Sequence, residues 1–186
     1  MARTPAAERN ALDPSAFRPI EGADGPTLSS ALHAIVTYAN STALRQQVMS
    51  RSDFPFPGDL SAFLVVNQLI YRGSARPTDL ANALDTGRSN ISKILARLES
   101  ADLVTRGTDP ADNRGVVVVL TPAGRELGAR ILSTGPRAAT LETWTSADAA
   151  RLEELVIKLA QHLDAAPDHP LATTTGLAFP RGGSPT

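Results

Sequence analysis

The chain has 186 residues, of which 42% are hydrophobic, and its formal net charge is −1. A chain of this length can bury one good core but not two large ones, so we expect one folded domain with tails. It contains no cysteine, which excludes disulfides and thiol-based redox sensing. Its three histidines lack metal-ligand spacing. No catalytic residue set and no glycine-rich phosphate loop is recognisable, so we expect neither an enzyme nor a cofactor.

The two ends of the chain lack periodic patterns. Residues 1–26 contain four prolines and should form a mobile arm. Residues 166–186 are rich in proline, glycine and threonine, and we expect disorder there. The N-terminus has no apolar core of signal-peptide length, and no stretch approaches the roughly 20 apolar residues of a membrane span. The sequence therefore predicts a cytoplasmic protein without a membrane segment.

Between the tails, residues 27–165 should form the folded domain, with helices at both of its ends. A helical stripe of apolar residues predicts one long helix from 27 to about 51, and a second helix follows, with Asp59 as its cap. After Thr121, which should cap a further helix, the pattern stays helical to about 165 with one interruption near 135. We expect 27–57 and 122–165 to pair with a second subunit.

The middle of the domain, 58–121, carries the most informative pattern. Residues 77–121 predict a short helix, a tight turn, a second helix and two strands, Leu103–Gly107 and Gly115–Thr121, joined by a polar loop. In the second helix, apolar residues at i, i+3, i+4 and i+7 place one face in the core: Ile91, Ile94, Leu95 and Leu98. The other face carries hydroxyl, amide and cationic side chains: Arg88, Ser89, Asn90, Ser92, Lys93 and Arg97.

These polar side chains suit hydrogen bonds to base edges and attraction to phosphate, although an ordinary solvated face would look similar. Arg76 and Thr78, at the start of the short helix, are candidates for contacts to a DNA backbone. Thr86 can cap the second helix and leave amide groups directed at phosphate. Arg114, in the loop between the strands, is expected to enter a minor groove. Asp112 would either orient an arginine or simply cap the turn.

Several short motifs, in this order and spacing, resemble the MarR family of bacterial transcriptional regulators. They are Leu80-Ala81, Ser89, Leu98-Glu99, Leu103-Val104, Arg106, Asp109-Pro110, Asp112, Arg114 and Leu120-Thr121-Pro122-Ala123-Gly124. The chain departs from the family where glycine usually ends the recognition helix. Asp102 stands there and must take a left-handed conformation if the cap is kept. Asn113 stands where a second arginine is common at the wing tip.

The resemblance implies a mainly α fold with a small β-hairpin wing, in which a winged helix-turn-helix is flanked by N- and C-terminal dimerisation helices. It implies a homodimer that binds double-stranded DNA at an inverted-repeat operator as a ligand-responsive repressor. The effector would be a small aromatic or anionic molecule bound between the dimerisation helices and the reading domain. A sustained apolar stripe in the last helix suits the dimer interface: Leu152, Leu155, Val156, Leu159 and Leu163.

Candidates for the effector pocket are His33, Tyr38, Phe63, Asn67 and Trp144, although a lone histidine or aromatic residue on a helix is more often packed or solvated. A second hypothesis is a winged-helix module that binds a protein partner and never touches DNA. It is favoured by the near-neutral charge, because residues 72–114 hold seven Arg and Lys against six acids. A third, a small-ligand carrier or enzyme, has no supporting residue set.

Overall fold

The structure is a computed structural model that describes residues 25–109, 112–134, 143–168 and 170–179. The chain divides into two compact units, 1–45 and 46–186. None of the helices in the described ranges combines the length and apolar character that crossing a bilayer requires.

The first unit contains α1 (Leu28–Asn40), and α2 (Thr42–Arg51) begins within it. Thr27 and Ser30 form a capping box at the start of α1. The sequence predicts one helix here, whereas the backbone turns extended at Ser41 (ψ 138°). Asn40 and Ser41 cause the break, because their short polar side chains bond to local groups: Asn40 Nδ2 donates to the Val36 carbonyl, and Ser41 Oγ accepts from the Leu44 amide.

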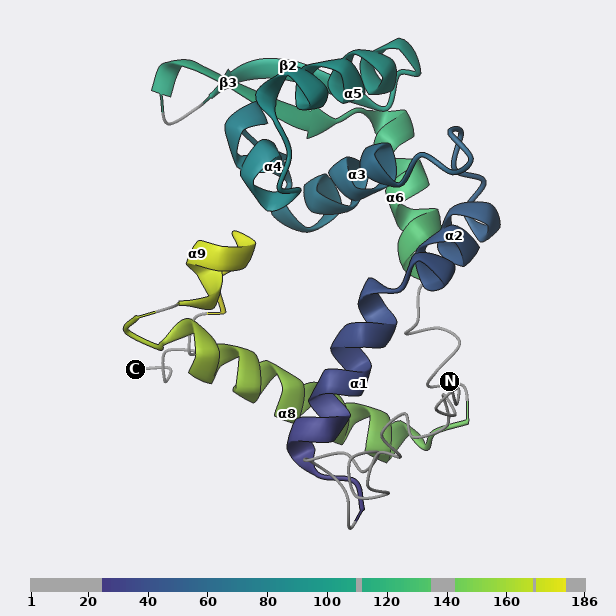
Figure 1. The fold of residues 1–186 in the computed structure, drawn as a ribbon, viewed down its shortest axis with the longest axis vertical. Coiled ribbons are helices and arrows are strands. Elements are labelled where there is room, and N and C mark those ends of the chain that lie inside the picture. The colour runs from purple at the N-terminus through teal and green to yellow at the C-terminus, as the bar shows by residue number, and fades with distance from the viewer. Residues whose placement is uncertain (1–24, 110–111, 135–142, 169, 180–186) are drawn as a thin grey trace, which may run out of the picture. The chain divides into compact units, whose positions relative to one another are not determined.

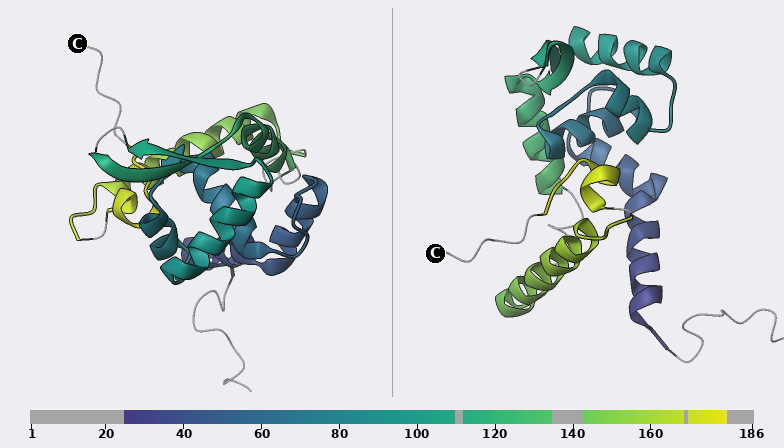
Figure 2. Two further views of the ribbon diagram at one scale, coloured as in Figure 1. Left: turned by 90° about the horizontal axis from the view of Figure 1, so that it is seen from above. Right: turned by 90° about the vertical axis from the view of Figure 1, so that its left-hand side faces the viewer.

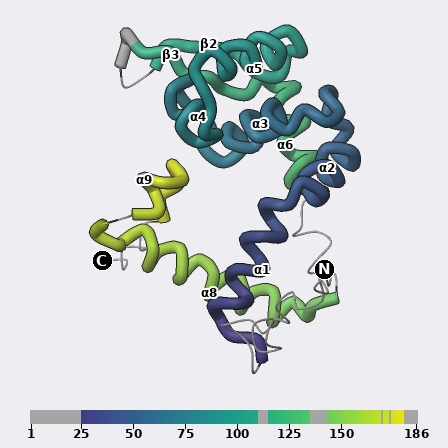
Figure 3. Tube along the Cα trace, in the orientation of Figure 1, coloured from purple at the N-terminus to yellow at the C-terminus, as the bar shows by residue number. Residues whose placement is uncertain are grey.

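The second unit holds a helix-turn-helix, a small sheet and the helices that follow it (Figure 1). Its remaining elements are α3 (Leu60–Arg72), β1 (Ser74–Ala75), α4 (Pro77–Ala83), α5 (Arg88–Ser100), β2 (Val104–Asp109), β3 (Asp112–Leu120), α6 (Pro122–Thr134), α8 (Ser146–Asp164) and α9 (Leu171–Thr175). Figure 3 follows the same path as a tube. The predicted fold class, mainly α with a β-hairpin wing, is confirmed.

The sheet has the order β1-β3-β2 and is antiparallel throughout. Val104 pairs with Leu120 and Thr108 with Val116, and the register shifts between Thr108 and Asp109. The sequence predicts only two strands, which are shorter than those observed. It misses β1, because two residues cannot show a periodicity, and it assigns parts of β2 and β3 to the loop, because polar residues there pair across the hairpin without an apolar pattern.

The predicted apolar face of α5 is confirmed as core. Ile91, Ile94, Leu95 and Leu98 are each at most 1% exposed. They are buried together with residues of the surrounding helices and sheet, among them Val65, Val66, Leu69, Leu80, Val118 and Leu127. This burial fixes the rotation of α5 about its axis, so its polar face must point outward.

The left-handed conformation predicted for Asp102 is confirmed, with φ 55°. The Leu103 amide donates to the Leu98 carbonyl at 2.9 Å, which closes a Schellman motif at the end of α5. The same motif ends α2 at Asp53 (φ 53°) and α4 at Asp85 (φ 47°). Three helices therefore end on aspartate where glycine is usual, at roughly 1 kcal/mol each, because aspartate tolerates this region better than most residues.

The start of α6 is joined tightly to the end of α5. Thr121 caps α6, as predicted: its Oγ accepts from the Gly124 amide at 3.0 Å and donates to the Asp102 carbonyl. The Thr121 amide donates to the Leu103 carbonyl at 3.1 Å. A Cβ on Gly124 would stand 2.0 Å from that same carbonyl oxygen, so only glycine allows this approach.

The helix α8 begins after Thr145, whose side chain accepts from the Asp148 amide at 3.1 Å. None of its residues is buried. Beyond it the sequence predicts disorder, whereas residues 171–175 form α9. The difference lies in Asp164, whose carboxylate accepts from the Ala172 amide (2.7 Å) and the Phe179 amide (2.8 Å). Asp164 is eight residues from Ala172, so no local sequence pattern predicts that it stabilises α9.

Candidate nucleic-acid interface

The outward face of α5 gathers short polar and cationic side chains at its N-terminal end. Arg88, Ser89, Asn90, Ser92 and Lys93 are all exposed, and the β2–β3 hairpin lies next to this helix (Figure 2). Within the part of the chain that the structure describes, the side chains of Arg88, Ser89 and Lys93 make no hydrogen bond or ion pair. Their donors can therefore reach an outside partner without first breaking an internal bond.

The cap of α5 differs from the prediction. Gly87 occupies the N-cap position and makes no side-chain bond to the helix amides. Thr86, the predicted cap, lies one residue too early, because its amide donates to the Ala81 carbonyl (3.0 Å) and closes the end of α4. Its hydroxyl accepts from Asn90 Nδ2 at 3.0 Å instead. The first amides of α5 thus lack a side-chain cap, and the positive end of the helix dipole favours an anion there.

Ser92 and Asn90 are both held before any partner arrives. Ser92 Oγ donates to the Arg88 carbonyl at 3.0 Å, which leaves its lone pairs available as acceptors. Asn90 uses an amide hydrogen on Thr86, which leaves a second hydrogen and the carbonyl oxygen. Asn90 can therefore both donate to and accept from a base edge, whereas Ser92 can accept while its hydroxyl hydrogen stays on the Arg88 carbonyl.

Arg76, a predicted DNA contact, is engaged by Asp109. Arg76 Nη2 lies 2.6 Å and Nε 2.8 Å from Asp109 Oδ2. The sequence suggests Asp112 as the partner of an arginine, which stays a prediction, and it does not reveal Asp109. No signal along the chain marks a pair whose members are 33 residues apart. Thr78 lies half-buried in the first turn of α4.

Two further cations of this segment are also in ion pairs. Arg106 Nε donates to Glu99 Oε1 at 2.9 Å, and Arg97 Nη2 lies 2.7 Å from Asp59 Oδ2. Because Asp59 is the N-cap of α3, this pair ties the second half of α5 to the start of α3. Arg97 is therefore less available to DNA than the sequence suggests, and the unpaired positive charge of α5 is concentrated on Arg88 and Lys93.

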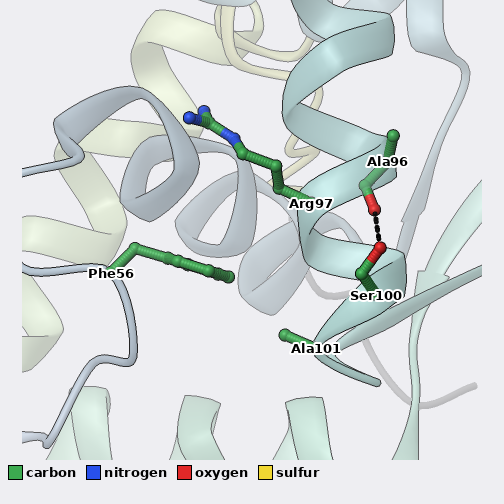
Figure 4. Close-up of a pocket in the computed structure, with 5 residues that line it drawn as sticks. All are labelled: Phe56, Ala96, Arg97, Ser100 and Ala101. Carbon is green, nitrogen blue, oxygen red and sulfur yellow. Dashed lines mark hydrogen bonds between the residues drawn. The ribbon is translucent and has the colours of Figure 1, made fainter.

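Arg97 also lines a shallow pocket of about 350 Å³ between α5 and the loop before α3 (Figure 4). Its other lining residues are Phe56, Ala96, Ser100 and Ala101. The Ser100 hydroxyl donates to the Ala96 carbonyl at 2.8 Å and is thereby satisfied within the helix. The pocket is an open depression beside the helix, and its lining residues do not form a set of polar groups that point toward a common ligand.

The wing tip is only partly described. Asp112 and Arg114 have strand backbone in β3, but their side chains lie outside the described parts, so the roles predicted for them stay predictions.

The predicted effector residues fall in both units. His33 and Tyr38 are exposed on α1, while Phe63 and Asn67 belong to α3; Trp144, before α8, is exposed. Phe63 is only 5% exposed, and its ring packs edge-on against Phe54 with 5.6 Å between centroids. It therefore belongs to the core in this conformation and is covered from a ligand. A pocket shared by the other residues stays a prediction.

Sequence reasoning did not find a cleft of about 230 Å³ between α3 and α6. Its walls are mostly apolar, with one guanidinium: Leu69, Ile70, Gly73, Leu120, Arg125, Gly128, Ala129 and Leu132. The described residues include no cluster of His, Asp and Glu that could hold a metal ion.

A support helix, a left-handed turn, a second helix with an outward polar face and an adjoining hairpin define a winged helix-turn-helix protein. Residues 59–116 match the model of the MarR family. The chain is 30% identical over 95 residues to an uncharacterized HTH-type transcriptional regulator, YxaD, of Bacillus subtilis, a match that covers 50% of this chain and 66% of that protein. It is 42% identical over 52 residues to a putative transcriptional regulatory protein for the hcr operon of Thauera aromatica, a match that covers 28% of this chain and 31% of that protein.

Among solved structures, a transcriptional regulator from Thermotoga maritima superimposes with a TM-score of 0.54 at 20% identity, covering 73% of this chain and 93% of that one, which supports the fold. Over residues 59–116 the chain belongs to the MarR family. Proteins of this family are transcriptional regulators and not enzymes. The matches span 66% and 31% of the two curated relatives, just under two thirds of one and about a third of the other.

Proposed function

We propose that this protein is a sequence-specific DNA-binding regulator of transcription that inserts α5 into the major groove. One observation carries the proposal: the polar face of α5 points outward, with Arg88, Ser89 and Lys93 not engaged by any described side chain. Cations supply attraction to phosphate, and Asn90 and Ser92 supply donors and acceptors for base edges. A regulator works where the chromosome is, which agrees with the cytoplasmic location expected from the sequence.

We further propose that the protein acts as a homodimer on an inverted repeat. The support is the apolar stripe of α8, which stays exposed along a helix of 19 residues. A stripe of this length on a soluble protein calls for a partner surface. Two copies related by a two-fold axis would place their α5 helices in successive major grooves about 10 bp apart.

Two variants of α5 separate reading from attraction. Asn90→Ala should lower affinity for the operator by about 1–3 kcal/mol per half-site and leave affinity for random duplex nearly unchanged, because it removes a possible base contact. Lys93→Ala should weaken both and reduce the slope of log affinity against log salt by about two for a dimer, one per lost phosphate contact. Fluorescence anisotropy with the promoter next to the gene and with scrambled duplex measures both.

The wild-type titration also distinguishes the two classes of function. Absence of binding to every duplex at low salt would favour the alternative, a winged-helix module that binds a protein partner. Arg51→Ala, at the exposed end of α2, serves as the control for loss of a cation.

We also propose that the protein is a repressor released by a small effector, and that the cleft between α3 and α6 receives it. Its apolar walls and the single Arg125 guanidinium suit an aromatic anion. Such a ligand can act only through a difference in its affinity for the DNA-bound and free arrangements.

Benzoate is a suitable probe for this cleft. It should weaken operator binding at millimolar concentration, and Arg125→Ala should reduce that response at least fivefold while operator affinity without benzoate changes little. Isothermal titration calorimetry and anisotropy measure the two effects. An unchanged benzoate response in the Arg125 variant would exclude this cleft as the site.

A further inference from the structure

Asp109 is a nearly buried carboxylate at the end of β2, where the hairpin turns. The residue is 7% exposed, and its side chain receives both Nε and Nη2 of Arg76 on one oxygen, at 2.8 and 2.6 Å. A carboxylate removed from water is costly unless it is paired and hydrogen-bonded. The pair with Arg76 therefore offsets part of the cost of burying this charge.

The pair spans the three-stranded sheet from one edge to the other. Arg76 directly follows β1, and Asp109 is the last residue of β2, while β3 lies between these two strands. Strands are spaced by about 4.8 Å, so the backbones on either side of β3 are about 10 Å apart, a gap that the long side chain of an arginine can cross. The contact joins the N-terminus of α4 to the turn end of the β2–β3 hairpin, and α4 and the hairpin are the elements before and after α5 in the chain.

Part of the Arg76 side chain still has access to solvent. The Arg76 side chain is 46% exposed, whereas that of Asp109 is 10% exposed. Arginine carries five N–H donors in a rigid plane, so a carboxylate that binds one edge fixes where the other edge points. An arginine held this way loses little side-chain freedom when it meets a phosphate.

We propose that Asp109 is a positioning residue that holds Arg76 in the orientation needed to bind a DNA backbone phosphate beside α5. The proposal rests on the proposed DNA-binding function. A carboxylate near DNA repels phosphate by its own charge. Asp109 would instead favour DNA binding, because it acts through the cation Arg76. The Arg106–Glu99 pair offers a contrast: the Glu99 side chain is 32% exposed, and exposed pairs restrict their members less.

The test uses the sign of the effect. If Asp109 acted only through its charge, Asp109→Asn would strengthen binding and steepen its salt dependence. The proposal expects operator affinity to fall roughly tenfold and the salt slope to become smaller by about two for the dimer, because Arg76 of each subunit loses its phosphate. Arg76→Ala should give the same loss of slope, and the double variant should bind no more weakly than either single variant.

Glu99→Gln is the matched control, since it removes the carboxylate of a neighbouring ion pair and should leave affinity unchanged or slightly higher. Arg76→Lys covers the case in which Asp109→Asn destabilises the fold, as judged by thermal unfolding. It keeps the charge but cannot place two donors on one oxygen in a fixed plane, so affinity should still fall. Unchanged or tighter binding by Asp109→Asn, or by Arg76→Lys when the first variant is unfolded, would overturn this proposal alone. Failure of the wild-type protein to bind any duplex would overturn the proposed function as well.

Discussion

Gly124→Ala should destabilise the protein by at least about 3 kcal/mol, the upper part of the range for overpacked sites. The added methyl carbon would stand 2.0 Å from the Leu103 carbonyl oxygen and 3.0 Å from its carbon, both of them backbone atoms. That oxygen already accepts from the Thr121 amide, so β2 and α6 cannot separate without breaking the bond. Alanine favours a helix over glycine by about 1 kcal/mol, but a backbone clash of this depth is larger.

Gly128→Ala is the control within the same helix. Its added carbon would meet side chains, those of Ile70 at 3.1 Å and Leu120 at 3.9 Å, which can shift, so the gain in helix propensity should roughly cancel the crowding. Urea unfolding followed by circular dichroism compares the two variants with the wild type. Equal stability of all three would show that α6 is free to move away from Leu103.

Leu159→Asp should convert the proposed dimer to monomers. Leu159 lies in the middle of the exposed stripe of α8 and is 37% exposed in the single chain. In a two-fold interface the substitution appears twice, and each unpaired carboxylate loses its water. With about 2 kcal/mol or more lost per subunit, the dissociation constant should rise at least about a thousandfold. Analytical ultracentrifugation measures it, and operator affinity should fall in parallel.

Ala150→Asp adds the same charge to the opposite side of α8. Ala150 is exposed and precedes Leu152 by two residues, which places it about 200° away around the helix. It should leave the dimer intact. Sedimentation of the Leu159 variant as a dimer would place the stripe of α8 outside the interface.

Local patterns were sufficient to predict the elements that depend on neighbours along the chain. The period of Ile91, Ile94, Leu95 and Leu98 predicts both the helix α5 and the direction of its polar face. Thr121 before a proline predicts the start of α6, and the family resemblance led to the left-handed Asp102. In each case the bonding partners lie within a few residues or one helical turn.

The features that the sequence does not reveal depend on partners far along the chain. The sequence alone suggests that the charges of Arg97 and Arg76 are available to DNA. In the folded chain Arg97 forms an ion pair with Asp59, and Arg76 forms one with Asp109. The break at Ser41 and the shift of the α5 cap from Thr86 to Gly87 have another cause. Each depends on which of two competing local hydrogen bonds forms. The spacing of apolar residues along the chain does not predict which bond that is.

The junction of Asp102, Leu103 and Thr121 has a mechanical consequence. Thr121, the cap of α6, donates to the carbonyls of Asp102 and Leu103, which connect the end of α5 to the start of β2. Gly124 packs directly against the Leu103 carbonyl, so these elements cannot move independently. A tilt imposed on the far end of α6 must therefore rotate the helix and the hairpin together. If α5 binds the major groove and the wing binds the minor groove, both contacts would be lost in a single step. Dissociation from an operator would then be abrupt and not graded.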